Sequence, residues 1–507
     1  MVFVILNLFQ DLKHHFCKHY LIFLYVCKRM SRTIRHIETT MLAMAFAILL
    51  LFAHSANAQQ TDEKVLYVVS VNDMHGNIDN FPQFAALLDT LRKQYPDLLL
   101  ISAGDNRTGH PVNDRYPKPS YPITKLMNEV HFDLSTLGNH EFDAGIESLR
   151  NVIGWSDFDY VCANAYFDDS INVKPYKIID YKGLKIGFVG GIQVGENGIP
   201  DFHPNCAKGV SFKPIEEVLP EYMYLRKECD MLFLISHCGL EADIEIAKKF
   251  PQFDAIFGGH SHKKIERTKL IGNTMITQSG KKLNYLTVSV FYFTNGKIDY
   301  KAQQVFSVKD FAKKDERIQK MVDEFGNLDI FRKVVGHNDA DIDSKEQLGC
   351  FMADVIRDAT KSDLAFQNPG GVRLDKLTTG EITTKDIYTL DPFDNIIMKY
   401  KVSGQEIMDM LEMACYKTED FPMLCSGCTC ILHRNEYEEI ESIELLLDNG
   451  KPLDLNAKYN IAINSYIASV YGFNKHKGKE FPHSCDLIFN YLEKRQHINY
   501  AGVTRIR

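Results

Sequence analysis

Beyond residue 60 the sequence lacks any apolar run of the roughly 20 residues that a membrane-spanning helix needs. It also lacks internal repeats, low-complexity tracts and an excess of positive charge. The chain carries a net charge of −8, and −12 once the first 58 residues are set aside, which argues against a nucleic acid as partner. A composition of 45% apolar and 24% charged residues is typical of a soluble globular protein, and 507 residues predict two domains with appendages.

The cysteines also lack the regular spacing of a small disulfide scaffold. Ten of them follow residue 58, and three cluster at Cys425, Cys428 and Cys430. A structural metal site would need a second ligand pair at a set spacing, which this cluster does not have. A disulfide or plain buried thiols are therefore the favoured interpretations.

The N-terminal segment has the pattern of a secretory signal peptide. Arg32 and Arg35 precede a continuous apolar run over 41–53, and a small-x-small sequence ends at Ala58. This pattern predicts a signal peptide over about 30–58 and an exported protein, periplasmic or extracellular. An uncleaved anchor is the alternative, but the apolar run is shorter than a membrane span, so no stable membrane anchor is expected.

Residues 59–309 alternate short apolar runs with polar, glycine-containing loops, as a first domain of mixed helices and strands would. Five runs are continuous in apolar character, which is typical of buried strands. They are Val65–Val71, Leu98–Ala103, Leu134–Leu137, Met231–Ile235 and Ala255–Phe257. Residues 176–190 and 286–300 predict hairpins, the second turning at Asn295-Gly296, and residues 81–95 have helical periodicity.

Residues 310–335 are expected to link two domains. The stretch 310–327 is highly charged and amphipathic with little around it to bury, which predicts a linker helix. A second domain is expected over 336–507, and the N-terminal extension with its signal peptide covers 1–58. In the second domain the pattern predicts helices at 348–360 and 404–414 and strands at 440–447 and 459–463.

Each of the five expected buried strands runs into a loop that carries metal-ligating residue types. Asp73 and His75 are two residues apart, so both point to one side of an extended segment. Strand ends that converge at one edge of a sheet would gather seven ligands. They are Asp73, His75, Asp105, Asn139, His237, His260 and His262. A lone Asp-x-His is more often surface decoration, but five such loops in order have no comparable explanation.

The type and number of these residues indicate two divalent metal ions. Oxygen and nitrogen ligands without thiolate suit Zn, Mn, Fe or Co, and seven ligands are too many for one tetrahedral ion. Two neighbouring dications need a bridging anion, for which Asp105 is the preferred candidate. With only two carboxylates the centre keeps a charge near +2 and can attract a phosphate dianion.

The ordered motifs resemble those of the calcineurin-like metallophosphatase superfamily. The segment from about 64 to 505 resembles the two-domain 5'-nucleotidase/UDP-sugar hydrolase family. This resemblance implies a four-layer α/β/β/α sandwich of two mixed sheets, followed by a second α/β domain. It assigns Asp73, His75, Asp105 and His262 to one metal, and Asp105, Asn139, His237 and His260 to the other.

The resemblance also makes His140 and Asp143 a catalytic dyad. His140 is adjacent to the ligand Asn139 and is free to hydrogen-bond the phosphoryl or leaving oxygen. Asp143 can hold the other ring nitrogen and favour the imidazolium, a role for which Glu141 could compete.

Two loops of the second half resemble the family's substrate-binding loops. Asn368-Pro-Gly-Gly-Val-Arg373 implies that Arg373 grips the substrate phosphate, because a guanidinium offers a bidentate fork. Pro392-Phe393-Asp-Asn implies that Phe393 stacks on a nucleobase, with Tyr466 on its other face. The loop after Tyr466 lacks the family's nucleoside-gripping Asp, and Lys345 is the only cation where the family has further arginines.

The sequence therefore predicts an exported phosphohydrolase that cleaves nucleoside 5'-monophosphates with metal-activated water. A nucleotide or other small phosphoester is the expected partner. A 2',3'-cyclic-nucleotide phosphodiesterase, a UDP-sugar hydrolase or a thiosulfohydrolase on the same scaffold are alternatives, to which the missing Asp points. A secreted non-catalytic nucleotide-binding protein is disfavoured, because all seven ligand residues are present.

Overall fold

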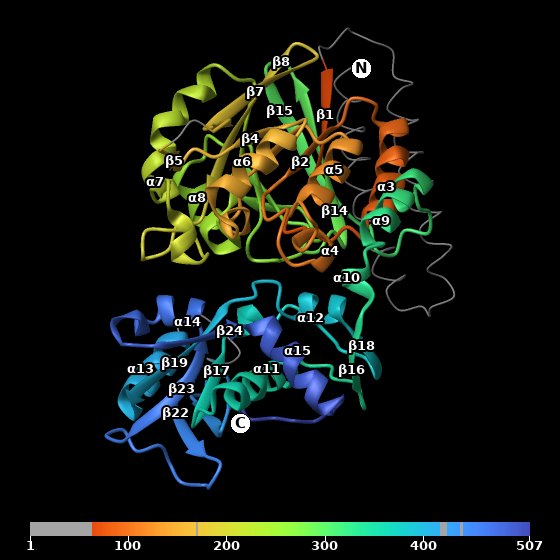
Figure 1. Cartoon of the computed structure of the whole chain (residues 1–507). Coiled ribbons are helices and arrows are strands. Elements are labelled where there is room, and N and C mark those ends of the chain that lie inside the picture. The colour runs from red at the N-terminus through yellow and green to blue at the C-terminus, as the bar shows by residue number, and fades with distance from the viewer. Residues whose placement is uncertain (1–62, 169–170, 416–422, 437–439) are drawn as a thin grey trace. The chain divides into compact units, whose positions relative to one another are not determined.

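The computed structural model describes residues 63–168, 171–415, 423–436 and 440–507. The predicted N-terminal extension and signal peptide over 1–58 lie outside the described residues. Residues 63–507 form one compact unit with an N-terminal lobe, drawn above, and a C-terminal lobe, drawn below (Figure 1). Among the described residues, the search for a helix long and apolar enough to cross a membrane found none.

The N-terminal lobe is built on two stacked sheets. The first has seven strands in the order β15 (Lys297–Ser307), β14 (Tyr285–Thr294), β1 (Glu63–Val71), β2 (Leu99–Ser102), β3 (Leu134–Thr136), β4 (Asp159–Val161) and β6 (Val173–Lys174). The second has six strands in the order β12 (Lys269–Ile271), β13 (Thr274–Thr277), β11 (Ala255–Gly258), β10 (Met231–His237), β8 (Leu184–Ile192) and β7 (Tyr176–Tyr181). A short pair, β5 (Ala165–Phe167) with β9 (Val210–Phe212), lies beside them.

Helices cover the outer face of each sheet. The first sheet carries α3 (Phe81–Gln94), α4 (Pro111–Asp114), α5 (Tyr121–Glu129) and α6 (Gly145–Trp155), and the second carries α7 (Ile215–Val218), η4 (Leu219–Lys227) and α8 (Leu240–Lys249). Between the sheets, side chains such as Leu66, Phe233 and Phe291 are fully buried. The strands are apolar on both faces because both faces are covered. The predicted α/β/β/α sandwich is confirmed.

The patterns that predicted strands and hairpins were accurate. The five buried runs form β1, β2, β3, β10 and β11, each within two residues of the expected bounds. The hairpin β14–β15 turns at Asn295-Gly296, where both residues have the positive φ that a tight hairpin turn requires. The expected helix at 81–95 is α3.

The predicted linker helix was wrong at its start. The helix α9 begins only at Glu316, where the Asp315 side chain accepts the backbone N–H of Ile318. It ends at Gly326 and packs on α3 through Ile318, Val322 and Phe325, which join the core of the N-terminal lobe. The helix is therefore amphipathic: its charged face is exposed, and its apolar face is buried against the N-terminal lobe. After α9 the chain passes through α10 (Asp329–Arg332) into the second lobe (Figure 1).

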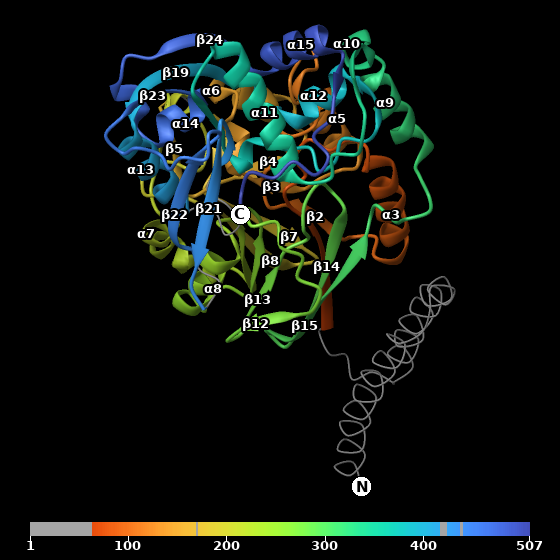
Figure 2. The ribbon, with the colours of Figure 1, turned by 90° about the horizontal axis from the view of Figure 1, so that it is seen from below.

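Among the described residues, the C-terminal lobe combines three sheets with five α-helices. Figure 2 shows this lobe from below. Its central sheet has the order β20 (Leu424–Ser426), β17 (Leu364–Gln367), β23 (Lys458–Asn464), β19 (Ile396–Ser403) and β24 (Lys479–His483). The smaller sheets are β18 (Gly380–Thr383), β16 (Val334–Asn338) and β25 (His497–Ile498), and the pair β21 (Cys428–Arg434) and β22 (Ile440–Leu447). The helices are α11 (Lys345–Thr360), α12 (Thr384–Leu390), α13 (Gly404–Cys415), α14 (Ser465–Val470) and α15 (Ser484–Arg495). The two helices and two strands predicted here are α11, α13, β22 and β23.

The three clustered cysteines are buried thiols. Cys425, Cys428 and Cys430 are free and 1% exposed, within the apolar core of the C-terminal lobe. The sequence left open a disulfide or plain buried thiols, and the structure shows buried thiols.

Candidate metal centre

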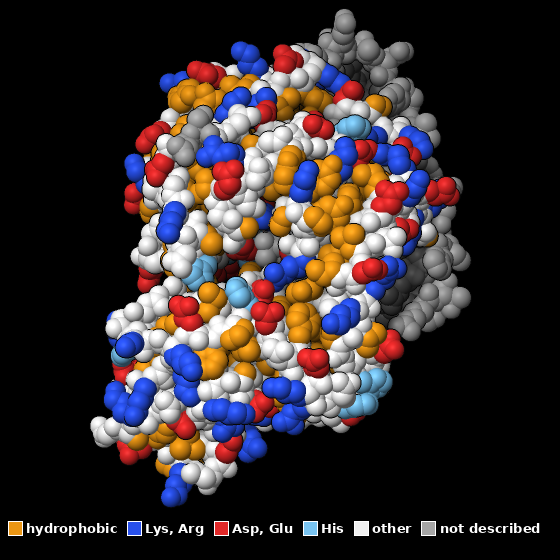
Figure 3. Space-filling view, in the orientation of Figure 1, with side chains coloured by type: hydrophobic (Ala, Val, Ile, Leu, Met, Phe, Trp, Pro, Cys, Tyr) orange, Lys and Arg blue, Asp and Glu red, His pale blue; other side chains and the backbone are white. Residues whose placement is uncertain are grey.

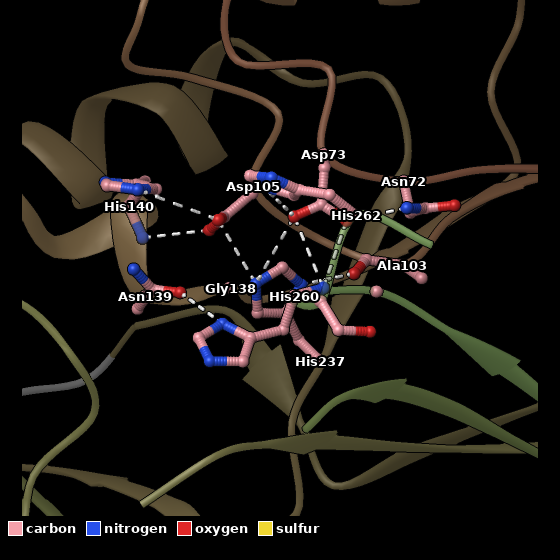
Figure 4. Close-up of polar contacts among 12 residues, drawn as sticks. Asn72, Asp73, Ala103, Asp105, Gly138, Asn139, His140, His237, His260 and His262 are labelled. Atoms are coloured by element: carbon pink, nitrogen blue, oxygen red, sulfur yellow. Dashed lines mark hydrogen bonds and ion pairs between the residues drawn. The ribbon is translucent and has the colours of Figure 1, made fainter. Parts of the chain in front are cut away.

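The polar loops after five strands meet at one edge of the two sheets. β1, β2 and β3 are parallel neighbours in the first sheet, and β10 and β11 are parallel neighbours in the second. Their carboxyl ends therefore point the same way. All seven predicted ligands come together there. Figure 4 shows Asp73, Asp105, Asn139, His237, His260 and His262, and His75 lies against His262.

One half of the cluster surrounds the Asp73 carboxylate. The Nε2 atoms of His75 and His262 lie 2.9 Å apart, and Asp73 Oδ1 is 3.9 Å from the first and 3.4 Å from the second. These three atoms are close enough to share one ion. Ligands at about 2.0–2.2 Å from a cation lie roughly 3 Å from one another.

The other half lies around Asp105. His237 Nε2 is 3.2 Å from Asp105 Oδ2 and 3.9 Å from Asp73 Oδ1. Asn139 Oδ1 is 3.0 Å from His260 Nδ1, and the His237 and His260 rings have centroids 5.2 Å apart. The Asn139 amide nitrogen donates to the backbone carbonyl of Asp201 at 3.0 Å, which turns its oxygen toward His260.

Contacts behind the rings fix which nitrogen faces the cluster. Nδ1 of His75 lies 3.0 Å from the carbonyl of Thr108, and Nδ1 of His237 lies 2.7 Å from the carbonyl of Ala103. Each carbonyl can accept only from an N–H, so Nε2 is left as a ligand. His237 Nε2 is fully buried and makes no well-aligned hydrogen bond among the described residues, although Asp105 Oδ2 lies 3.2 Å away. A cation beside it would satisfy that atom, so the residues present fit a metal centre.

Charge in the cluster also fits a cation. Burial and the Arg373 guanidinium lower the pKa of His75 well below its ordinary value, so this ring is neutral, the form that binds metal. Burial lowers the pKa of His237, but the Asp105 carboxylate outweighs it and the pKa rises to about 10. A metal ion between these two groups would replace that proton.

Five of the seven residues have left-handed backbone conformations. The φ angles are 51° at Asp73, 49° at His75, 52° at Asp105, 75° at His260 and 56° at His262. Such angles are uncommon for residues with a Cβ and recur at functional sites. The sharp turns let consecutive loop residues aim several side chains at one point.

Glu141 holds two of these loops together from behind. Its carboxylate accepts the backbone N–H groups of Asp105 at 2.9 Å, Asn106 at 2.8 Å and Gly138 at 2.6 Å. A Cβ on Gly138 would lie 2.2 Å from Asp105 Oδ1, so only glycine fits there. From the sequence, Glu141 was an alternative to Asp143 as the carboxylate that holds His140. Its carboxylate instead faces the backbone of the Asp105 loop.

His140 and Asp143 lie at the edge of the cluster. His140 Nδ1 is 2.7 Å from Asp143 Oδ2, and His140 Nε2 is 3.9 Å from Asp105 Oδ2. Burial lowers the pKa of His140, but Asp143 and Asp105 outweigh it and raise the pKa to about 9. The Asp143 carboxylate thus favours the imidazolium form of His140, which can donate a hydrogen bond to a phosphoryl or leaving oxygen.

A cavity of about 540 Å³ opens beside the dyad, between the two lobes. Figure 3 shows the recess, with His and acidic side chains at its rim. The predicted substrate residues Asn368, Arg373, Phe393 and Tyr466 all line it, together with His140 and Asp143.

Arg373 reaches from the C-terminal lobe into the metal cluster. Its Nη2 lies 3.0 Å from His75 Nδ1 and 3.3 Å from His75 Nε2. The Phe393 ring stacks near His140, with centroids 5.7 Å apart, and the Arg373 guanidinium lies 5.9 Å from its centre. The second lobe therefore brings a cation and an aromatic ring to the first lobe's polar centre.

Sequence reasoning missed Asp201 and Arg115, which also line the cavity. Asp201 accepts a hydrogen bond from the Tyr466 hydroxyl at 2.8 Å, and Arg115 forms an ion pair with Asp394 at 3.0 Å. Neither belongs to a motif, since Asp201 lies in an irregular loop and Arg115 ends a four-residue helix. Lys345, noted in the sequence, is not among the residues lining the cavity.

Family models match both lobes. Residues 66–264 match the calcineurin-like phosphoesterase model, and residues 332–475 match the model of the 5'-nucleotidase C-terminal domain. The chain is a calcineurin-like phosphoesterase with a 5'-nucleotidase C-terminal domain. The family resemblance inferred from the motifs is confirmed, and this phosphoesterase is a metal-dependent phosphoric monoester hydrolase, as the sequence predicts.

The phosphoesterase is similar to several bacterial proteins. It is 26% identical over 500 residues to the 5'-nucleotidase of Vibrio cholerae, covering 82% of this chain and 87% of that protein. It is 24% identical over 468 residues to endonuclease YhcR of Bacillus subtilis, covering 80% of this chain but 37% of YhcR. The chain thus spans little more than a third of that relative's length.

Its fold matches a solved 5'-nucleotidase precursor from Thermus thermophilus. The TM-score is 0.77 at 20% identity, over 88% of this chain and 99% of that chain. At this identity the match is evidence for a shared fold of both lobes.

Proposed function

We propose that this phosphoesterase hydrolyses nucleoside 5'-monophosphates to nucleoside and phosphate. The observation that carries the proposal is the approach of Arg373 to His75, which joins a phosphate-binding cation to the ligand cluster. The aromatic side chains of Phe393 and Tyr466 line the cavity that continues from this point. Similarity to the Vibrio cholerae 5'-nucleotidase over most of both chains supports the same substrate class.

The centre would hold two divalent ions, Zn, Mn, Co or Fe. Asp73, His75, Asp105 and His262 would hold one, and Asp105, Asn139, His237 and His260 the other, with Asp105 as the bridge. When bound, such ions polarise the phosphoryl group and activate a water molecule as nucleophile. Both Asp73 and Asp105 lie within 4 Å of His237 Nε2, so the two halves of the cluster are contiguous.

The chain's own residues would bind the phosphate and supply the proton. Arg373 would hold the phosphoryl oxygens through its guanidinium fork. The His140 imidazolium would donate to the phosphoryl or leaving oxygen, with Asp143 holding its ring in place.

Phe393 and Tyr466 would bind the base, with Asn368 beside them. Stacking of a base on an aromatic ring contributes about 1–3 kcal/mol. Phe393→Ala is therefore expected to raise KM for AMP about tenfold and to leave turnover of an aryl phosphate nearly unchanged. Because the Phe393 ring also stacks near His140, kcat on the aryl ester must be measured as the control. Equal losses on both substrates would mean that Phe393 supports the dyad rather than the base, and no loss on AMP would contradict the base pocket.

The second candidate is a phosphodiesterase or another ester hydrolase on the same scaffold. The absent Asp after Tyr466 favours it, and one relative that covers this chain's two lobes is named an endonuclease. Hydrolysis rates on AMP, UMP, UDP-glucose, a 2',3'-cyclic nucleotide, thiosulfate-type esters and an aryl phosphate would rank the candidates. AMP must be among the fastest substrates for the 5'-nucleotidase proposal to hold.

The protein would act outside the cytoplasm, as the pattern over residues 30–58 indicates. N-terminal sequencing of protein from the native host is expected to begin at Gln59 or within a few residues. A cytoplasmic protein that retains residues 30–58 would contradict export.

A further inference from the structure

A second group of metal-ligating side chains lies on the small sheet at the start of the C-terminal lobe. His337 in β16 is paired directly with His497 in β25 across a parallel ladder. Their rings lie on one face of the sheet, with centroids 4.9 Å apart. In the orientation of Figure 1, His side chains gather at the right of the lower lobe, where β16 and β18 are drawn (Figure 3).

Asp339 completes the group. It lies two residues beyond His337, so it faces the same side, and its N–H continues the ladder by donating to the carbonyl of Ile498 at 2.9 Å. Its Oδ1 is 2.7 Å from Nδ1 of His497. One ligand atom from each of the three side chains lies within 4.8 Å of the other two.

Several features keep these residues in place. The backbone N–H of His337 donates to the carbonyl of Gln496 at 2.8 Å. Gln496 itself has a φ of 62° and ψ of −39°, which turns the chain sharply at the end of α15 and sets His497 opposite His337. Glu381 is paired with His337 from the other neighbour, β18, so its side chain leaves the sheet on the same side.

The donor set defines the chemistry of the ligand. Two imidazoles and a carboxylate without thiolate suit a borderline divalent transition-metal ion such as Zn²⁺, Ni²⁺ or Cu²⁺ rather than Ca²⁺ or Mg²⁺. A simple His497–Asp339 ion pair would account for two of the residues. It leaves unexplained why a second imidazole lies beside the first, with the ring planes tilted by 43°.

We propose that His337, Asp339 and His497 bind a divalent transition-metal ion at a site separate from the catalytic cluster. With ligand bonds of about 2.0–2.1 Å, the ion would lie between the two rings and displace the proton shared by His497 and Asp339. Such an ion ties the last strand, β25, to β16, the first strand of the C-terminal lobe. It therefore stabilises the C-terminal lobe without contacting the substrate.

The test measures metal binding beyond the catalytic ions. Full-length protein is saturated with Mn²⁺ and then titrated with Zn²⁺, with calorimetry and thermal unfolding as readouts. His497→Ala and His337→Ala are each expected to weaken this additional Zn²⁺ binding at least tenfold, to abolish the associated rise in Tm and to leave hydrolysis of an aryl phosphate unchanged. Asp339→Asn is expected to weaken binding less.

His433→Ala is the matched control. His433 is likewise a strand histidine of the C-terminal lobe, half-exposed and 3.8 Å from a carboxylate, that of Glu444, but no second imidazole of the described residues lies beside it. This variant must retain the additional site. A Cu²⁺ electron paramagnetic resonance spectrum of the wild type is expected to show two nitrogen ligands, and that of His497→Ala one. Equal Zn²⁺ binding by wild type and His497→Ala would overturn the proposal, as would a wild type that takes up no ion beyond the catalytic centre.

Discussion

The hydroxyl of Tyr466 donates a hydrogen bond to Asp201 Oδ1 at 2.8 Å, and so links the C-terminal lobe to the loop that orients Asn139. The same Asp201 accepts the Asn139 amide through its backbone carbonyl at 3.0 Å. One residue therefore contacts both a proposed metal ligand and a proposed substrate ring. Asp201 therefore connects the cavity wall to the metal cluster through two hydrogen bonds.

Tyr466→Phe and Tyr466→Ala separate the two roles of this side chain. The Phe variant keeps the ring and loses one hydrogen bond, which is worth about 1 kcal/mol, so KM for AMP is expected to rise less than about fivefold. The Ala variant also loses the ring and is expected to raise KM tenfold or more. Steady-state kinetics on AMP would check this. Identical kinetics for the two variants would contradict stacking by Tyr466.

His140→Ala is expected to lower kcat by roughly 10²–10⁴, the usual contribution of a positioned acid–base group, while the metal content stays the same. The reason is that His140 contacts Asp143 and lies next to the ligand cluster without being one of the seven proposed ligands. The test measures kcat by steady-state kinetics and metal content by elemental analysis for the wild type and the variant. A His140→Ala protein that has lost its metal would show that the ring belongs to the coordination shell.

Glu141→Ala should damage stability and metal affinity together. The substitution leaves three backbone N–H groups without their acceptor, which costs about 2–5 kcal/mol, and it releases the loop that carries Asp105. We expect a lower Tm and metal affinity reduced 10- to 100-fold. Glu147→Ala in α6 is the control, because that side chain is 80% exposed and forms an ion pair with the neighbouring Arg150. Unchanged metal affinity in Glu141→Ala would show that the loops keep their form without this carboxylate.

Chelation is expected to abolish hydrolysis, and added Mn²⁺, Co²⁺ or Zn²⁺ to restore it. Asp73→Asn removes the charge that lies within 4 Å of His75, His237 and His262, so metal content and activity should both fall at least a hundredfold. Asp89→Asn, at an exposed position in α3, should change neither. Full activity of a protein shown by elemental analysis to be free of metal would contradict a metal-dependent reaction.

The sequence predicted the N-terminal lobe well because its signals are local. Continuous apolar runs such as that of β10 mark strands buried on both faces, and Asn295-Gly296 marks a tight hairpin turn. The ligand cluster followed from one further rule, that parallel strands end at a common edge. This rule gathers the loops of β1, β2 and β3 in one sheet and those of β10 and β11 in the other, and the stacking of the two sheets brings both sets together.

Contacts between the lobes could not be predicted in the same way. Arg373 and His75 are 298 residues apart, and their distance depends on how the two lobes meet. Asp201 lies in a loop with no periodicity, so nothing in the sequence distinguishes it from other surface acids. The early start predicted for α9 has a related cause. The charge pattern of residues 310–327 begins before Asp315, whose side chain caps the helix, so the pattern alone does not show where the helix starts.

The left-handed backbone at Asp73, His75, Asp105, His260 and His262 bears on how this protein could change over evolutionary time. Each such conformation costs about 1–3 kcal/mol for a residue that carries a Cβ, and glycine or asparagine would adopt it with less strain. At these five positions aspartate and histidine combine a strained backbone with side chains that belong to the ligand cluster. In a lineage released from selection for catalysis, mutation would favour Gly and Asn there first, and the protein would become more stable as it lost its reaction. A sequence of this fold with glycines at several of these positions would therefore be identified as a former enzyme.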